Sequence, residues 1–147
     1  MRLKIMELRY KRELEKLIEK AEKSLEASEN LYNSEFYDFA VSRIYYSMFY
    51  CVKALLLTKE INPKKHSGVL KMFAKEFIKT NELDVELFEY INEAYNYRQT
   101  ADYDATIEIK KEEAEYLLHK GHIFLNKTKK YLISKNILKG ENDNTKS

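Results

Sequence analysis

Glycine and proline are scarce in this chain, whose 147 residues include three glycines and one proline. These residue types supply most tight turns and breaks in regular structure, because glycine tolerates positive φ and proline fixes φ and lacks an N–H donor. Alanine, leucine, glutamate and lysine, which favour helices, are plentiful. Few turns and many helix formers predict an all-α protein, and an apolar content of 44% is enough for the core of one domain.

Apolar residues recur at steps of three and four along most of the chain, which is the period of an amphipathic helix. The second predicted helix is apolar over more than half of its circumference and is therefore expected at the centre of the molecule. Because short connections favour antiparallel neighbours, we predict an up-and-down bundle of four or five helices in one domain, 1–138, followed by a flexible tail, 139–147. The expected helices cover 6–31, 35–60, 66–78, 84 to at least 98, and 110–132, and 102–109 fits either a helix end or a short extended stretch.

Charge and cysteine content exclude several classes of protein. The formal net charge of +2 argues against a protein that coats nucleic acid in bulk and against an acidic solvating tail. Cys51 is the single cysteine, so no internal disulfide framework exists, and its apolar surroundings favour a core position. The amino-terminal sequence lacks the apolar segment of a signal peptide, and the run IYYSMFYCVKALLL is shorter than the roughly 20 residues that cross a bilayer. We expect a cytoplasmic protein without a membrane segment.

Candidate metal ligands form no recognised pattern. Glu115, His119 and His122 share one face of a predicted helix, but no carboxylate stands three positions before a histidine, as a ferritin-like site would require. Glycine-rich loops that cradle phosphate are also missing. We expect neither a metal site nor a cofactor.

The stretch AVSRIYYSMFYCVKALLL places an arginine, Arg43, among apolar residues. Helical spacing puts a set of polar and aromatic side chains near one side of this helix. One interpretation is packing or a dimer contact, with Arg43 paired to Asp38 or Asp102. The other interpretation is a functional strip. The set comprises Phe39, Arg43, Tyr46, Ser47 and Tyr50.

The stretch YRQTADYD brings Arg98, Asp102 and Tyr103 close together in the sequence. Arg98 and Asp102 are four residues apart and can pair on one helical face if the helix persists that far. An exposed pair of this kind adds about 0 to 1 kcal/mol of stability. If Arg98 is partly buried, its planar guanidinium can instead serve as a fixed fork for phosphate.

The order SRIYYSMFYCVKALL, KKHSGVLKMFAKEFIK and YRQTADYD resembles the HEPN-domain proteins, in a small branch that carries an Arg-x-x-x-Asp-Tyr motif. The resemblance covers roughly residues 20–133. It implies a helical bundle that forms a homodimer and is the partner of a minimal nucleotidyltransferase in a toxin–antitoxin module. Active branches of the family are metal-independent ribonucleases built on Arg-x(4 to 6)-His, whose residues from two subunits meet in a cleft.

Carried over to this sequence, Arg98 matches the arginine of that motif, but the histidine is absent. Tyr103, Asp104 and Ala105 stand five, six and seven positions after Arg98. A histidine would act as general base and acid near neutral pH, whereas tyrosine, with a pKa of about 10, is a poor base there. His66 is the one histidine in the matching stretches.

Three functions therefore remain open. The chain is a metal-independent endoribonuclease toxin, a catalytically silent module that binds nucleotide or RNA phosphate in a dimer cleft, or a purely structural dimer. The missing histidine favours the second slightly. Arg98 is the predicted catalytic or phosphate-binding residue, and the residues predicted to bind or to order the site are Asp102, Tyr103, Arg43, Tyr46 and His66.

The last predicted helix has a basic end, because no acidic residue stands between Tyr116 and Gly140. Its lysines either track phosphate or complement the helix dipole and keep the surface soluble. These lysines are Lys120, Lys127, Lys129, Lys130, Lys135 and Lys139.

Overall fold

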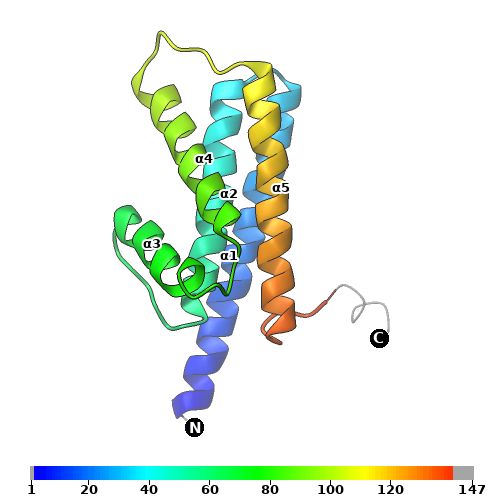
Figure 1. Cartoon of the computed structure of the whole chain (residues 1–147). Helices are drawn as coiled ribbons and strands as arrows, with labels where there is room; N and C mark the ends of the chain where they lie inside the picture. Colours follow the sequence, from blue (N-terminus) through cyan, green and yellow to red (C-terminus); the bar gives the residue numbers. More distant parts are fainter. Residues whose placement is uncertain (1, 141–147) are drawn as a thin grey trace.

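The computed structural model describes residues 2–140, with side chains described from residue 8 onward. Its regular elements are helices, as predicted, and they follow one another along the chain from the amino terminus (Figure 1). The elements are α1 (Arg2–Asn33), α2 (Tyr37–Leu57), α3 (His66–Phe73), the π-helical turn η1 (Ala74–Ile78), α4 (Val85–Tyr103) and α5 (Lys111–Ser134).

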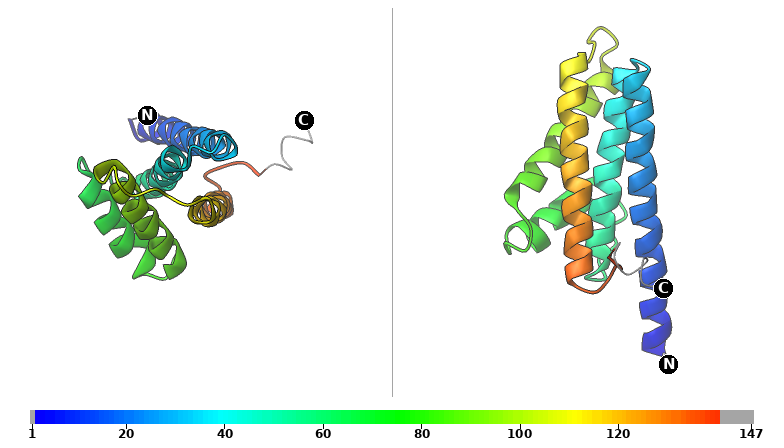
Figure 2. Two further views of the ribbon diagram at one scale, coloured as in Figure 1. Left: turned by 90° about the horizontal axis from the view of Figure 1, so that it is seen from above. Right: turned by 90° about the vertical axis from the view of Figure 1, so that its right-hand side faces the viewer.

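The four long helices run up, down, up and down, which confirms the predicted all-α, up-and-down bundle. Helix α2 lies at the centre and contacts α1, α4, α5 and α3, while the short α3 and η1 pack to one side of it (Figure 2). The central place of α2 follows from its sequence, since side chains around most of its circumference are buried. Cys51 is among them, and burial raises the pKa of its thiol to about 12, as expected for a core cysteine.

Small residues let α1, α2 and α5 approach one another closely. The Ser47 hydroxyl donates a 2.8 Å hydrogen bond to the Ala21 carbonyl oxygen. The Ser24 hydroxyl donates a hydrogen bond of the same length to the backbone carbonyl oxygen of Arg43. Both bonds join α1 to α2. A Cβ atom on Gly121 of α5 would lie 2.9 Å from Leu25 Cδ1, so a larger residue there would force the Leu25 side chain to shift.

Helix α2 starts two residues later than predicted, and the end of α4, which the sequence analysis left open, is now located. Helix α2 begins at Tyr37, because Glu35 takes a φ of 65° and reverses the chain just before it. Helix α4 continues to Tyr103, and the following turn is closed by Asp104, whose carboxylate accepts a 3.0 Å hydrogen bond from the Thr106 N–H. The predicted flexible tail lies outside the described residues from position 141 onward.

Candidate functional site

Arg98 occupies a position on α4 that its spacing would assign to the core. Leu87, Ile91 and Ala94 are fully buried at steps of four and three, and Arg98 follows after another step of four. The arginine therefore faces α2, with 23% of its side chain exposed. Because α4 remains helical beyond Arg98, Asp102 lies on the same face, with Oδ2 3.3 Å from Arg98 Nε.

The guanidinium of Arg98 lies over two tyrosine rings of α2. Its Cζ atom is 5.3 Å from the centre of the Tyr45 ring and 5.0 Å from that of Tyr46. Nε is buried and within ion-pair distance of Asp102, yet none of the described residues accepts a hydrogen bond from it with good geometry. Hydrogen bonds are directional, so the short distance between Arg98 Nε and Asp102 Oδ2 does not by itself make one. Aromatic contacts hold this arginine while its exposed nitrogens remain open to an anion.

Tyr46 lies between two arginines. Arg43 Cζ is 4.7 Å from the centre of its ring, so that positive charges from α2 and α4 meet on one aromatic side chain. Within residues 8–140 Arg43 has no ion-pair partner, and its predicted pairing with Asp38 or Asp102 is wrong. Asp38 instead accepts a 3.1 Å hydrogen bond from the Ile109 N–H. Two guanidinium groups at one ring create a local positive potential that attracts anions.

His66, the first residue of α3, is brought to the same place from a distant part of the chain. Its imidazole stacks on Phe49 with ring centres 4.2 Å apart and meets Tyr46 edge to face at 6.3 Å. Burial and the positive charges of Arg98 and Lys53 lower the pKa of His66 below its usual value. A histidine in this environment is neutral at pH 7 and can accept a proton.

The Tyr45 hydroxyl is a buried polar group without a partner among the described residues. The side chain is fully buried between Tyr46, Tyr95 and Phe49, and burial raises the pKa of its hydroxyl to about 12, although Arg98 opposes this. Tyr45 was not among the predicted site residues, although it stands in SRIYY, the part of the second predicted helix that matches the Arg-x-Tyr-Tyr pattern of the family. A buried hydroxyl without a partner is uncommon in folded proteins and marks strained or functional positions.

Two residues from the sequence analysis lie apart from this cluster. Tyr103 is 82% exposed at the end of α4, and its position five residues after Arg98 places it on a different side of the helix. Ser47 faces α1, where it is buried, and so does not belong to the strip with Arg43 and Tyr46. The structure thus brings together Arg98, Asp102, Arg43, Tyr46 and His66 of the predicted residues, and adds Tyr45 and Phe49.

Most lysines of α5 are engaged with neighbouring side chains. Lys127 Nζ is 2.8 Å from Asp84, Lys129 Nζ is 3.6 Å from Glu22, and Lys120 lies over the rings of Tyr90 and Tyr116. Lysines with such partners are less available to phosphate. This arrangement favours the structural interpretation of the basic end of the chain.

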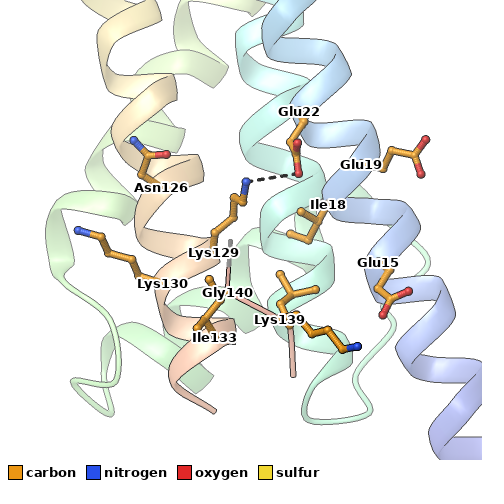
Figure 3. Close-up of a pocket in the computed structure, with 11 residues that line it drawn as sticks. Glu15, Ile18, Glu19, Glu22, Asn126, Lys129, Lys130, Ile133, Lys139 and Gly140 are labelled. Atoms are coloured by element: carbon orange, nitrogen blue, oxygen red, sulfur yellow. Dashed lines mark ion pairs between the residues drawn. The ribbon is translucent and has the colours of Figure 1, made fainter. Parts of the chain in front are cut away.

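A groove between α1 and α5 does not include Arg98 in its lining (Figure 3). It has a volume of about 640 Å³, and acidic residues of α1 face lysines of α5 across it. The ion pair between Glu22 and Lys129 bridges it. Because charges of both signs line this groove, it has no preference for an anion.

The histidines of α5 do not build a metal centre in the part of the chain that the structure describes. His122 Nε2 contacts the carboxylate of Glu29 on α1. Within residues 8–140, no three histidine, cysteine, aspartate or glutamate side chains are arranged to hold a metal ion. None of the described helices is long and apolar enough to cross a membrane.

Comparison with known proteins identifies relatives over most of the chain. The family model described as "HEPN domain" matches residues 14–131. A Methanocaldococcus jannaschii protein named "Putative toxin MJ0605" is 42% identical over 120 residues, which cover 82% of this chain and 89% of that protein. A UPF0332 protein of Thermotoga maritima is 38% identical over 124 residues, covering 82% and 94%, and one of Gloeobacter violaceus is 31% identical over 121 residues, covering 82% and 96%. The chain folds as a helical bundle, and these relatives match it along nearly their whole length. Because the family model also spans most of the chain, this chain belongs to the HEPN domain family.

Proposed function

We propose that this chain is the HEPN subunit of a toxin–antitoxin pair, that it binds RNA or nucleotide phosphate at Arg98 in a cleft between two copies, and that a minimal nucleotidyltransferase is its protein partner. The observation that carries the proposal is Arg98 itself. It is a largely buried arginine that lies over two tyrosine rings and within ion-pair distance of Asp102, while its Nε atom has no hydrogen-bond acceptor among the described residues. The relative named as a toxin supports the biological setting.

A phosphate group fits this environment better than a purely structural role does. A structural arginine in a partly buried position normally donates hydrogen bonds from all of its N–H groups, whereas Arg98 has one carboxylate, Asp102, within ion-pair distance and no acceptor for its Nε–H among the described residues. The guanidinium of Arg98 presents a planar fork that matches two phosphate oxygens. Arg43 adds a second positive charge at the Tyr46 ring. The site is therefore suited to an anion that has more than one oxygen acceptor.

The homodimer in this proposal rests on an exposed aromatic pair at the start of α2. Phe36 is 54% exposed and Phe39 is 64% exposed, and their rings meet edge to face at 6.3 Å. Large apolar side chains gathered at one place on a surface mark interaction sites. A twofold contact there would bring two copies of α2 together and place both Arg98 sites beside the interface.

The test is phosphate binding by Arg98 variants of the full chain. We expect Arg98→Ala to abolish binding of a nucleoside triphosphate and of single-stranded RNA while leaving the melting temperature nearly unchanged. Arg98→Lys keeps the charge but loses the planar fork, so it should bind weakly. Arg12→Ala on α1, which removes the same charge from an exposed position, is the matched control. Unaltered binding by a folded Arg98→Ala protein would refute the proposal.

One observation favours the ribonuclease as a second candidate. His66 packs against Tyr46, over which Arg98 lies, so the structure supplies a histidine to the site from α3 in place of the missing motif histidine. In such a reaction His66 takes the proton from the 2′-hydroxyl, and the resulting oxygen attacks the adjacent phosphorus. The 5′-oxygen leaves and receives a proton, which the imidazolium can return. The products are a 2′,3′-cyclic phosphate and a free 5′-hydroxyl.

A cleavage assay in the presence of chelator tests this candidate. Because the pKa of His66 lies below its usual value of about 6.5, the neutral base prevails at pH 7, and the rate should fall only as the pH is lowered past that usual value. His66→Ala should reduce cleavage about 100-fold or more, the usual contribution of a general base. His119→Ala on α5, an exposed histidine, is the control. RNA that stays intact with the unaltered protein eliminates this candidate and leaves the binding function standing.

A further inference from the structure

A second cationic surface lies beyond Tyr46, near the carboxyl end of α2. It is a groove of about 330 Å³ between α1 and α2, lined by three lysines together with apolar and polar side chains. Its one carboxylate, Glu13, lies 3.4 Å from Arg9 and is thus engaged with a positive charge outside the groove. The lining residues are Glu13, Lys16, Leu17, Lys20, Lys53, Leu57 and Asn62.

The three lysines of this groove differ from those of α5. Within residues 8–140, Lys16, Lys20 and Lys53 have no ion-pair partner, whereas Lys127 and Lys129 are paired with carboxylates of neighbouring helices. Their charges are therefore not neutralised by the described part of the protein. A concave surface with three unpaired lysines concentrates positive potential.

A row of aromatic rings connects this groove to Arg98. The rings of Tyr46 and Tyr50 are 6.2 Å apart, and Lys20 Nζ lies 5.2 Å from the centre of the Tyr50 ring. Arg98 lies over Tyr46 at the other end of the row. Lys53 acts on His66 as well, since its charge contributes to the lowered pKa of the imidazole.

The connecting residues form one face of α2, because they stand at alternating steps of four and three. We call this face the α2 strip. It begins with the exposed Phe39 and continues with half-buried side chains. From Arg43 to Lys53 it spans about 15 Å, since a helix rises about 1.5 Å per residue. The strip consists of Phe39, Arg43, Tyr46, Tyr50 and Lys53.

We propose that the α2 strip and the lysine groove form a track for single-stranded RNA, which extends the phosphate site at Arg98 to a length of about four nucleotides. The proposal rests on the proposed function and names its ligand. Proteins that hold single strands combine a positive groove for the backbone with aromatic rings on which bases stack. At a rise of about 3.4 Å per stacked nucleotide, 15 Å corresponds to about four nucleotides. A mononucleotide would occupy the Arg98 end alone.

Binding of oligouridylates from one nucleotide to about eight, measured by competition against a labelled strand, tests the track in the full-length protein. We expect the affinity to rise up to about four nucleotides and then to level off. Lys20→Gln with Lys53→Gln should weaken binding of the longer strands, and lower the slope of log affinity against log salt by about 0.7 for each lysine. Binding of one nucleotide should remain unchanged in this variant.

Two further variants separate stacking from charge. Tyr50→Leu should weaken binding of the longer strands about 5-fold or more, as expected for the loss of one stacked base. Lys23→Gln on α1 is the matched control, because Lys23 pairs with Glu19 at 3.1 Å and lies outside the groove. Circular dichroism should show the same helix content and melting temperature for all variants.

Three outcomes would overturn the track. In the first, a mononucleotide binds as tightly as a strand of about eight nucleotides, and Arg98→Ala still abolishes binding. The phosphate site at Arg98 would then act without a track. Another is that the lysine variants leave RNA affinity unchanged but weaken association with a purified protein partner, which would make the groove a protein interface. If neither nucleotide nor RNA binds at all, the proposed function fails and the track fails with it.

Discussion

At the scale of single residues, the site is defined by polar groups that stand where apolar ones are expected. Arg98 continues a buried stripe of α4, and Tyr45 places its hydroxyl in the densest part of α2. A buried polar group without a partner costs free energy, and this applies to the Tyr45 hydroxyl and to the Nε–H of Arg98, although Asp102 offsets part of the charge of Arg98. Both groups adjoin Tyr46, so this part of the molecule is not optimised for stability alone.

Replacement of Tyr45 by Phe tests this explanation directly. Because the hydroxyl has no partner among the described residues, Tyr45→Phe should leave the free energy of unfolding unchanged or raise it by up to about 1 to 2 kcal/mol. Urea denaturation measures the difference. A loss of stability by more than about 1 kcal/mol would show that the folded protein already satisfies the hydroxyl.

At the scale of helices, the sequence analysis was most successful where apolar periodicity was long. The five expected helical regions are present, and the long α1, α2 and α5 follow from apolar stripes that run without interruption. The helix that a given side chain faces was harder to predict, because it depends on how the helices pack against one another. The orientation of Ser47 toward α1 could not be read from spacing, since Ser47 lies on the border between two faces of α2.

The meeting of His66 with Arg98 shows the same limit at the site. The two residues stand 32 positions apart in the sequence, and no local pattern specifies how α3 folds back onto α2. Phe49 holds the imidazole in place, yet in the sequence it is one more aromatic residue in an apolar run. In contrast, the pairing of Arg98 with Asp102 followed from helical spacing alone and is confirmed.

The close approach of α5 to α1 and α2 gives a prediction at this scale. Any side chain at Gly121 would press on Leu25 and Ile44, since a Cβ atom would lie 2.9 and 3.2 Å from their nearest atoms. Gly121→Val should lower the free energy of unfolding by about 1 to 3 kcal/mol through overpacking. Gly121→Ala should cost less, because alanine regains up to about 1 kcal/mol in helix propensity. Chemical denaturation orders the two variants, and equal stability of Gly121→Val and the unaltered protein would contradict this account.

At the scale of the whole molecule, the bundle covers α2 on most of its faces and leaves one open. Helices α1, α4 and α5 pack around it, and α3 covers part of its carboxyl half. The α2 strip is the face that these helices do not cover. Its composition changes along its length, from the exposed Phe39 at one end to Lys53 at the other. The aromatic end is suited to contact with protein, while the cationic end is suited to an anionic chain. A second copy and an RNA strand could thus use neighbouring parts of one face.

The oligomeric state tests this division of the α2 strip. We expect the full chain to have twice its monomer mass of 17.6 kDa in light scattering at micromolar concentration. Replacement of both Phe36 and Phe39 by Ser should yield a folded monomer, because the aromatic pair that would form the contact is lost while the buried core is untouched.

Val85→Ser is the matched control, since Val85 is also an exposed apolar side chain, at 56%, but lies at the start of α4. This variant should remain a dimer. The monomeric variant should still bind a mononucleotide through Arg98, which neither substitution touches. A monomeric mass for the unaltered chain, or a dimer that survives the loss of both phenylalanines, would show that the aromatic end of the α2 strip serves another purpose.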